Sequence, residues 1–291
     1  MNPVTDHDRY LVTGARGMLG QAVLAVLRAQ GRAVRGADLP EVDLTDPAVV
    51  RRVWETERPT HVIHCAAYTN VDGAESDGEL CMRLNVRMPE RVARACAQIG
   101  ARMLMISTDF VFDGQARRPY RETDPTGPLS VYGRTKLEGE QAAAAVLEDL
   151  QIARTAWLFG PGKRNFVSAM IERMRKGIPL RVVDDQWGSP TYTGDLAGRL
   201  VELSRLEERG VFHLVNGGMT TWCGLTRKAA ELAGFVSYAI EAIDTASYPL
   251  PAHRPAWSVL DCSRAWALGV TPMRDWTEAL AEYIRLYADN M

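Results

Sequence analysis

The chain has 291 residues, of which 46% are hydrophobic and 24% charged, and its formal net charge is -2. This length suits one large α/β domain with an appended lobe. The small net charge gives no electrostatic reason to expect nucleic acid or an anionic membrane surface as a partner. A small-molecule ligand is therefore favoured.

Five scattered cysteines form no Cys-x-x-Cys pair, which indicates reduced thiols in a cytoplasmic protein. Residues 1–9 lack the basic and apolar regions of a signal peptide, and no run of eighteen apolar residues occurs. We therefore expect neither export nor a membrane span. The sequence also contains no histidine and cysteine cluster of the kind that holds a metal, and we expect no metal site.

Short apolar runs alternate with helix-like patterns through the first half of the chain. The expected strands cover residues 9–13, 33–38, 61–67, 102–108 and 151–157. The expected helices cover residues 18–30, 47–57, 79–99 and 131–147. This alternation predicts βαβ units and an α/β fold with a doubly wound parallel sheet, as in the Rossmann fold.

A glycine loop, Gly14-Ala15-Arg16-Gly17-Met18-Leu19-Gly20, joins the first strand directly to the first helix. Glycines at this point permit a tight turn and close approach to a pyrophosphate, and the helix N-terminus supplies N–H donors. Glycines at this spacing would fit a plain structural turn, but the strand before and the helix after favour dinucleotide binding. The expected contacts are Gly14, Arg16, Gly17, Met18, Leu19 and Gly20.

The end of the second strand bears on the choice of cofactor. Asp38 can accept hydrogen bonds from the adenosine ribose, which favours NAD. Arg16 and Arg35 could instead neutralise a 2′-phosphate, so both NADPH and NADH stay open. Asp43 and Leu44 are expected beside the adenine, although Asp43 could also cap the next helix.

Beyond residue 157 the alternation weakens, and segments rich in proline and glycine interrupt it at 158–163, 184–190 and 247–255. A strand pattern returns at 211–216. We therefore expect a discontinuous organisation: residues 1–158 and 193–216 form the dinucleotide-binding domain, and residues 159–192 and 217–291 form a smaller substrate lobe.

Tyr132 and Lys136 are spaced to lie on one face of a helix. A nearby ammonium stabilises a phenolate, so the lysine is expected to lower the pKa of the tyrosine. Ser107 and Thr108 end the preceding strand, and their hydroxyls should emerge at the carboxyl edge of the sheet, where ligands bind in open α/β sheets.

The glycine loop, Ser107-Thr108 and Tyr132-x-x-x-Lys136 together resemble the short-chain dehydrogenase/reductases, and the length is similar to that of their extended branch, which modifies sugar nucleotides. Four longer strings and one late pair resemble, more narrowly, the dTDP-4-dehydrorhamnose reductases. These are STDFVF at 107–112, PLSVYGRTK at 128–136, DQWGSPT at 185–191, HLVNGG at 213–218 and Arg254-Pro255. The resemblance spans essentially the whole chain.

The resemblance implies reduction of the C4 ketone of a dTDP-4-keto-6-deoxy sugar by hydride from NADPH or NADH. Tyr132 would donate the proton, and Thr108 would hydrogen-bond the same carbonyl oxygen. Lys136 would hold the nicotinamide ribose. No metal is required for this chemistry.

The resemblance also implies further contacts on both sides of the reaction centre. The turn formed by Ala66, Ala67 and Tyr68 would face the cofactor. Asp72, within the same stretch, could cap a helix, and Glu75 could lie on plain surface. The expected substrate-binding residues are Val71, Glu75, Thr108, Asp109, Trp157, Gln186, Trp222 and Arg254, with Arg254 at the diphosphate.

Two other functions remain open from the residues. A nucleotide-sugar epimerase or dehydratase would share the fold, although Thr108-Asp109-Phe110 lacks the glutamate that a dehydratase normally places beside the aspartate. A non-catalytic regulatory subunit could keep the dinucleotide fold, although Thr108, Tyr132 and Lys136 argue against that. The nucleotide-sugar substrate is the expected partner, together with a second copy in a homodimer.

Overall fold

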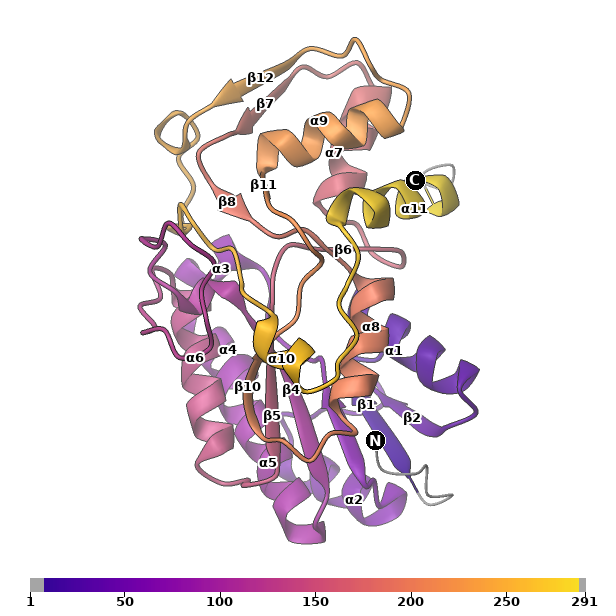
Figure 1. Ribbon diagram of the computed structural model, residues 1–291. Helices are drawn as coiled ribbons and strands as arrows, with labels where there is room; N and C mark the ends of the chain where they lie inside the picture. Colours follow the sequence, from indigo (N-terminus) through magenta and orange to yellow (C-terminus); the bar gives the residue numbers. More distant parts are fainter. Residues whose placement is uncertain (1–7, 288–291) are drawn as a thin grey trace.

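The computed structural model describes residues 8–287, and its centre is a six-stranded parallel sheet (Figure 1). The strands lie in the order β10-β5-β4-β3-β1-β2. Their bounds are β1 (Arg9–Thr13), β2 (Ala33–Ala37), β3 (His61–His64), β4 (Arg102–Thr108), β5 (Leu150–Thr155) and β10 (Gly210–His213). Because the chain leaves β1 for β2 on one side and places β3 on the other, the strand order reverses there, which is where such sheets bind ligands.

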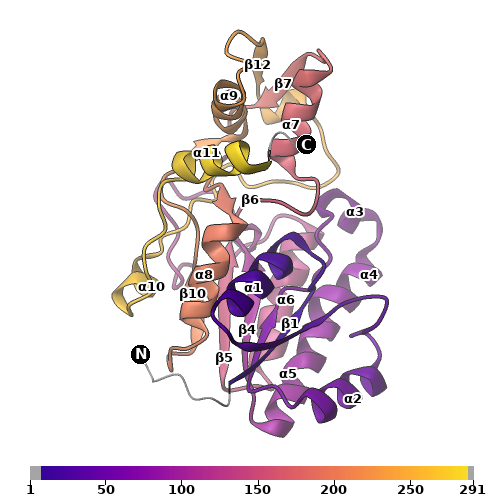
Figure 2. The same cartoon turned by 90° about the vertical axis from the view of Figure 1, so that its right-hand side faces the viewer.

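Helices cover both faces of this sheet, as Figure 2 shows from the side. One face packs against α1 (Met18–Ala29) and α8 (Thr193–Leu203), and the other against α2 (Pro47–Glu57), α5 (Met88–Ile99) and α6 (Val131–Ala144). Alternate residues of β4 pack on opposite faces of the sheet. Leu104 lies in the core with α1 and α8, and Met103 and Met105 lie in the core with α2, α5 and α6. Strands buried on both faces explain the nearly continuous apolar runs in the sequence.

Local sequence signals account for several helix ends. Asp46 caps α2 by accepting a hydrogen bond from the Ala48 N–H, and Pro47 follows it. Gly31 has a φ of 68° just after α1, a conformation that glycine adopts without steric cost. The suggestion that Asp43 caps α2 was therefore wrong, and Asp43 instead accepts hydrogen bonds from Thr45.

The expected helix at 79–99 is divided into three parts. These are α4 (Gly78–Met82), a π-helical turn at Arg83–Arg87, and α5. Such turns are frequent at functional sites. Here the turn contains Asn85, which is buried against α6, where a Cβ on Gly139 would come within 1.9 Å of the Asn85 carbonyl oxygen.

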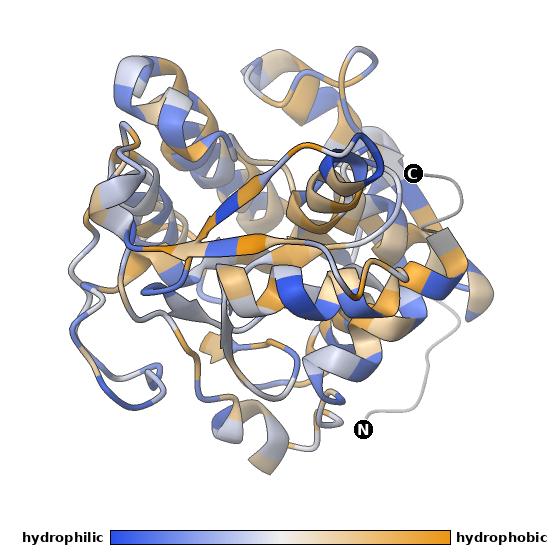
Figure 3. Cartoon of the chain, turned by 90° about the horizontal axis from the view of Figure 1, so that it is seen from above, coloured by the Kyte–Doolittle hydropathy of each residue, from blue (hydrophilic) through white to orange (hydrophobic). Residues whose placement is uncertain are grey.

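A smaller lobe, above the sheet in Figure 1, has its own apolar core. Its helices are α7 (Phe166–Arg175), α9 (Trp222–Leu232) and α11 (Trp276–Tyr287). Three short strand pairs complete it: β7 (Leu180–Val183) with β12 (Ile240–Ile243), β6 (Leu158–Phe159) with β9 (Thr191–Tyr192), and β8 (Trp187–Gly188) with β11 (Thr220–Thr221). Seen from above, the helices of the molecule carry both hydrophilic and hydrophobic residues (Figure 3), as expected of helices buried on one side.

Two late segments depart from this division. The short helix α10 (Ser263–Ala267) and the turn after it send Ala265, Val270 and Met273 into the core beside the sheet. In the first half of the chain, the short helix α3 (Val71–Ser76) follows β3.

The expected doubly wound parallel sheet is confirmed. Four expected strands extended past their true ends, at Ala37, His213, His64 and Thr155. For the last two, the apolar runs continue because the residues that follow line a cleft instead of pairing in the sheet. Within residues 8–287, the structure contains no helix that is long and apolar enough to cross a membrane.

Candidate active site

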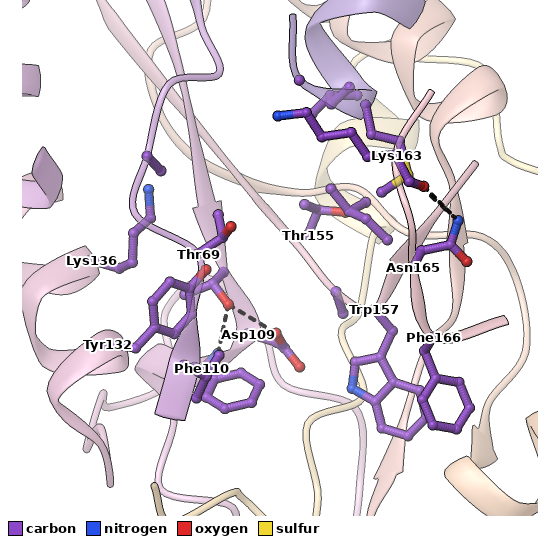
Figure 4. Close-up of a pocket in the computed structure, with 18 of the residues that line it drawn as sticks. Thr69, Asp109, Phe110, Tyr132, Lys136, Thr155, Trp157, Lys163, Asn165 and Phe166 are labelled. Carbon is purple, nitrogen blue, oxygen red and sulfur yellow. Dashed lines mark hydrogen bonds between the residues drawn. The ribbon is translucent and has the colours of Figure 1, made fainter. Parts of the chain in front are cut away.

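A cleft of about 1220 Å³ lies at the carboxyl edge of the sheet and is lined by residues of both the sheet and the smaller lobe. The segments that follow β1, β3, β4 and β5 all contribute to it. Figure 4 shows Tyr132 and Lys136 on one side of this cleft and Trp157 and Phe166 on the other.

The glycine loop fits a bound pyrophosphate. Gly14 has a φ of 63°, and a Cβ there would lie 2.7 Å from the Ala66 nitrogen. A Cβ on Gly20 would lie 2.1 Å from the Gly14 carbonyl oxygen. Gly17 is the N-cap of α1 and has no side chain to occupy the first N–H groups of that helix. These donors and the helix dipole can therefore serve an anionic ligand.

Asp38 and Arg16 meet at the end of β2. The Asp38 carboxylate accepts one hydrogen bond of 2.8 Å from the Arg16 backbone N–H and another of 2.8 Å from the Leu39 N–H. The Arg16 side chain points elsewhere and pairs with Glu41 at 2.5 Å. Arg16, Arg35 and Glu41 line a second, smaller pocket of about 430 Å³, so acidic and basic groups both surround this point.

The turn after β3 is anchored from behind by Asn85. Its side-chain oxygen accepts a hydrogen bond of 2.9 Å from the Tyr68 N–H, and its amide donates one of 3.1 Å to the Tyr68 carbonyl. Ala66 and Ala67 line the cleft, whereas the Tyr68 side chain does not. The small side chains of the two alanines leave room at the cofactor side of the cleft.

Thr108 ends β4 with its hydroxyl in the cleft. The hydroxyl donates a hydrogen bond of 3.0 Å to Asp109 and accepts one of 3.2 Å from the Phe110 N–H, as the dashed lines in Figure 4 show. Asp109 is only 2% exposed, and this burial raises the pKa of its carboxyl to about 6. Residues 109–111 form a short 3-10 turn that Thr108 caps.

Tyr132 and Lys136 lie one turn apart on α6, as the spacing predicted. The Lys136 ammonium donates a hydrogen bond of 2.8 Å to the Ile106 carbonyl on β4, and burial lowers the pKa of this lysine to about 8. Burial also raises the pKa of Tyr132 well above its usual value, and the neighbouring Asp109 acts in the same direction.

The expected lowering of the Tyr132 pKa by Lys136 was therefore wrong for this structure. Burying a phenolate is the main cause of the raised pKa, and the Lys136 ammonium is directed at a backbone carbonyl. Tyr132 is therefore protonated at neutral pH.

A buried ionic group lies behind the reacting side chains. Glu140, one turn after Lys136, accepts two hydrogen bonds from Arg154, of 2.9 Å and 2.6 Å, and a third from the Ser107 hydroxyl. The same carboxylate favours the charged form of Lys136. Sequence reasoning missed Glu140 and Arg154, since only a register of β4, β5 and α6 brings them together.

The far wall of the cleft is aromatic. Trp157 and Trp222 are stacked with centroids 3.6 Å apart and planes 6° from parallel, and Phe166 lies 4.5 Å from Trp222. Trp157 has a φ of 47°, which is uncommon outside glycine. A Cβ on Gly188 would come within 2.4 Å of the Trp157 ring, so this glycine makes room for it.

The remaining expected substrate residues come from the smaller lobe. Gln186 is 5% exposed and donates a hydrogen bond of 3.0 Å to Thr245. Arg254 forms a double hydrogen bond with Asp72 from α3, at 3.0 Å and 2.8 Å. Asp72 is thus not a helix cap, because Asn70 caps α3.

Most of the expected site residues line the one large cleft. They are Gly14, Gly17, Met18, Leu19, Gly20, Asp38, Asp43, Leu44, Ala66, Ala67, Val71, Thr108, Asp109, Tyr132, Lys136, Trp157, Gln186, Trp222 and Arg254. Three lie outside it. Arg16 lines the smaller pocket, the Tyr68 hydroxyl lies beside Gly73, and Glu75 is exposed and accepts a hydrogen bond of 2.8 Å from the Val131 N–H.

Three cations that the sequence reasoning did not single out also line the cleft: Lys163, Arg164 and Arg181. Lys163 ends the segment rich in proline and glycine at 158–163 and Arg164 follows it, so a positive pair after β6 was the available signal. Among the described residues, 8–287, no group of three or more histidine, cysteine or acidic side chains is arranged to hold a metal ion. All five cysteines are free.

Comparison with known proteins places these features in a family. A profile of the RmlD substrate binding domain matches residues 8–288. A dTDP-4-dehydrorhamnose reductase from Streptomyces griseus is 44% identical over 280 residues, covering 94% of this chain and 92% of that protein. A dTDP-4-keto-6-deoxy-D-glucose reductase from Streptomyces niveus is 40% identical over 276 residues, covering 94% and 96%.

The fold agrees with a solved structure of the same kind. The crystal structure of a dTDP-4-dehydrorhamnose reductase from Bacillus anthracis in complex with NADP matches with a TM-score of 0.91 and 31% identity, covering 96% of this chain and 99% of that one. The chain therefore belongs to the RmlD substrate binding domain family, which confirms the resemblance to the dTDP-4-dehydrorhamnose reductases.

Proposed function

We propose that the chain is an NAD(P)H-dependent reductase of the C4 ketone of a dTDP-4-keto-6-deoxy sugar, with dTDP-4-dehydrorhamnose as the substrate and dTDP-rhamnose as the product. One observation carries the proposal: Thr108, Tyr132 and Lys136 meet in the same cleft as the glycine loop. The names of the relatives support the same chemistry.

The roles of the residues follow from their positions. With its pyrophosphate held at the glycine loop, a reduced nicotinamide dinucleotide would supply the hydride. Tyr132 donates a proton to the ketone oxygen, and it is in its protonated form at neutral pH before the transfer. The Thr108 hydroxyl turns from Asp109 to the same oxygen and stabilises the developing negative charge.

Lys136 has a different task in this proposal. Its ammonium is held by the Ile106 carbonyl and lies within reach of ribose hydroxyls on the cofactor side of the cleft. The aromatic wall of Trp157, Trp222 and Phe166 excludes water from the sugar. The further contacts expected from the sequence keep their proposed roles, with Asp38, Asp43 and Leu44 at the adenosine and Val71 and Gln186 at the substrate.

The division of the chain is part of the proposal. Residues 1–158 and 193–216 form the dinucleotide-binding domain, and residues 159–192 and 217–291 form the substrate lobe. The separate apolar core that joins α7, α9 and α11 supports this division. The α10 segment, which packs against the first domain, is the exception.

The proposal extends to the cellular compartment and the oligomeric state of the protein. Free cysteines support a cytoplasmic protein, because disulfides are rare in that compartment. A homodimer is proposed because twofold dimers are the commonest homo-oligomers of soluble proteins. Sedimentation of the purified chain at micromolar concentration tests the dimer, and a monomer would contradict it.

The deciding experiment mixes the purified chain with NADPH and a dTDP-4-keto-6-deoxy sugar and follows absorbance at the nicotinamide band. We expect one NADPH consumed for each sugar reduced. Formation of an epimer without net NADPH consumption would identify an epimerase instead. Tight dinucleotide binding without any turnover of several such sugars would identify a regulatory subunit.

A further inference from the structure

Asp72 and Arg254 form a polar contact in the wall of the cleft. Arg254 Nη1 donates to Asp72 Oδ1 at 3.0 Å, and Nη2 donates to Asp72 Oδ2 at 2.8 Å. Both residues line the cleft, and their side chains are 18% and 33% exposed for Arg254 and Asp72 respectively. The pair is thus partly shielded from water, where a charge-assisted double hydrogen bond is stronger than at an open surface.

The pair joins distant parts of the chain. Asp72 lies on α3, directly after the turn that follows β3, and Arg254 lies in the loop at 247–255. Asp72 Oδ1 also accepts a hydrogen bond of 3.2 Å from the Ala252 N–H, so the carboxylate holds both the side chain and the backbone of that loop.

The donors of Arg254 are only partly used by these contacts. Nη1 binds Asp72 and the Ala252 carbonyl, the latter at 3.0 Å, and Nη2 binds Asp72 with one of its two N–H groups. Among residues 8–287 no hydrogen bond uses Nε. In a planar guanidinium, Nε–H and the second N–H of Nη2 lie along one edge, which matches two phosphate oxygens.

We propose that Asp72 is a positioning residue: it fixes Arg254 from one edge so that the other edge is ready for the diphosphate of the nucleotide sugar. This inference rests on the proposed function, which supplies the diphosphate. The carboxylate and the phosphate do not compete, because they use different edges of the same guanidinium. A guanidinium held in advance loses less conformational freedom on binding, which raises affinity.

The test is isothermal calorimetry with thymidine diphosphate and the full chain. Asp72→Asn keeps the shape of the side chain but removes one acceptor and its charge, and we expect about tenfold weaker binding. Arg254→Ala should weaken binding about ten- to a hundredfold. In the double variant, Asp72→Asn should add less than about twofold to the loss from Arg254→Ala, because Asp72 acts through the arginine.

Two controls make the result specific. Asp124 accepts two hydrogen bonds of 2.8 Å from Arg118, as Asp72 does from Arg254, but this pair lies outside the cleft. Asp124→Asn should therefore leave thymidine diphosphate binding unchanged. Asp72→Glu, which restores the charge, should recover part of the lost affinity. NADPH affinity and the melting temperature report whether each variant is folded. If Asp72→Asn does not fold, the thymidine diphosphate affinity of Asp72→Glu tests the inference in its place.

Steady-state kinetics distinguish this role from a general effect on the structure. Asp72→Asn should raise KM for the nucleotide sugar and leave kcat within about threefold, because the lost contact binds the substrate and the transition state equally. The inference is overturned if Asp72→Asn binds thymidine diphosphate as tightly as the wild-type chain or more tightly. It is also overturned if Asp72→Asn causes the same loss of affinity in the Arg254→Ala variant as in the wild-type chain. If the wild-type chain reduces the sugar, only this inference falls. If it neither binds thymidine diphosphate nor reduces the sugar, the proposed function falls with it.

Discussion

Glu140 and Arg154 form an ion pair 2.6 Å apart whose side chains are only 4% and 5% exposed. The pair lies between α6 and β5, behind Lys136 and Ser107. Removing one partner of this pair should strongly destabilise the fold, because the remaining charge would be buried without a counter-ion.

We predict that Glu140→Gln lowers the free energy of unfolding by about 3–5 kcal/mol, since Arg154 then stays buried without its partner. Urea denaturation measures the change. Glu90→Gln, which breaks an exposed pair with Arg94 on α5, is the matched control and should cost less than about 1 kcal/mol. Similar losses for the two variants would show that the burial of the first pair has no energetic weight.

Tyr132→Phe should reduce kcat by roughly 100- to 10,000-fold, because it removes the proton donor and little contact area. The NADPH dissociation constant should change by less than about twofold. Single-turnover measurements provide the comparison, since they isolate the chemical step. A variant that kept more than about half of the wild-type rate in that step would refute the role of Tyr132.

Cofactor preference should depend on Arg16 and Glu41. Both NADPH and NADH should support turnover, because the acidic Asp38 and the basic Arg16 meet at the end of β2. Arg16→Ala should weaken NADPH more than NADH, by about tenfold in relative affinity. Glu41→Gln should do the opposite, since it releases the Arg16 side chain from its ion pair.

Fluorescence titration of both dinucleotides with these two variants provides the measurement. Arg35→Ala is a useful comparison, because Arg35 lines the same small pocket. Equal losses of NADPH and NADH affinity in Arg16→Ala would mean that Arg16 does not meet the 2′-phosphate.

Gly188→Ala should destabilise the chain by about 1–3 kcal/mol, because the new methyl group would meet the Trp157 ring at 2.4 Å. It should also raise KM for the nucleotide sugar by displacing the aromatic wall. Gly198→Ala is the control: this glycine lies inside α8 with no neighbour in the way, and the change should stabilise by up to about 1 kcal/mol. Thermal unfolding of the two variants measures the change in the free energy of unfolding. No change for Gly188→Ala would contradict the close contact with Trp157.

The stability of the fold should depend on pH through Lys136. Burial lowers its pKa from 10.5 to about 8, so between these two values the unfolded chain binds a proton that the folded chain has released. The free energy of unfolding contributed by this group therefore rises with pH across that window, by on the order of 3 kcal/mol, and its burial penalty is complete below pH 8.

Lys136→Met should remove this dependence. Denaturation of both proteins from pH 7 to 10.5 gives the difference, with Lys176→Met as the control because its lysine is 60% exposed. A wild-type protein that showed no gain relative to Lys136→Met across the window would contradict the burial of a charged lysine.

Much of this arrangement can be predicted from the sequence, and the reasons are local. The alternation of apolar runs and helical patterns predicts the parallel sheet, and parallel strands end at one edge. Gly14 and Thr108 must therefore lie at the same edge of the sheet although they are 94 positions apart in the sequence. The spacing of Tyr132 and Lys136 places both on one face of α6.

Other features depend on tertiary contacts that no local pattern encodes. The pKa of Tyr132 follows from how deeply α6 is buried, and its direction was predicted wrongly. Asp72 resembles a helix cap until Arg254, 182 positions later, is seen beside it. The π-helical turn at Arg83–Arg87 carries Asn85 against Tyr68 and Gly139, whereas the sequence suggests one uninterrupted helix.

The pairing of β10 with β5 has a consequence for how the chain is made. All six residues of β5 are buried, yet β10, its partner on the side away from β4, begins only at Gly210, after the first segment of the smaller lobe, residues 159–192, has been synthesised. A nascent or truncated chain that stops before Gly210 exposes β5 as an unpaired edge, which invites association with other chains. Translation must therefore pass through residues of the smaller lobe before the sheet that carries Thr108 can close.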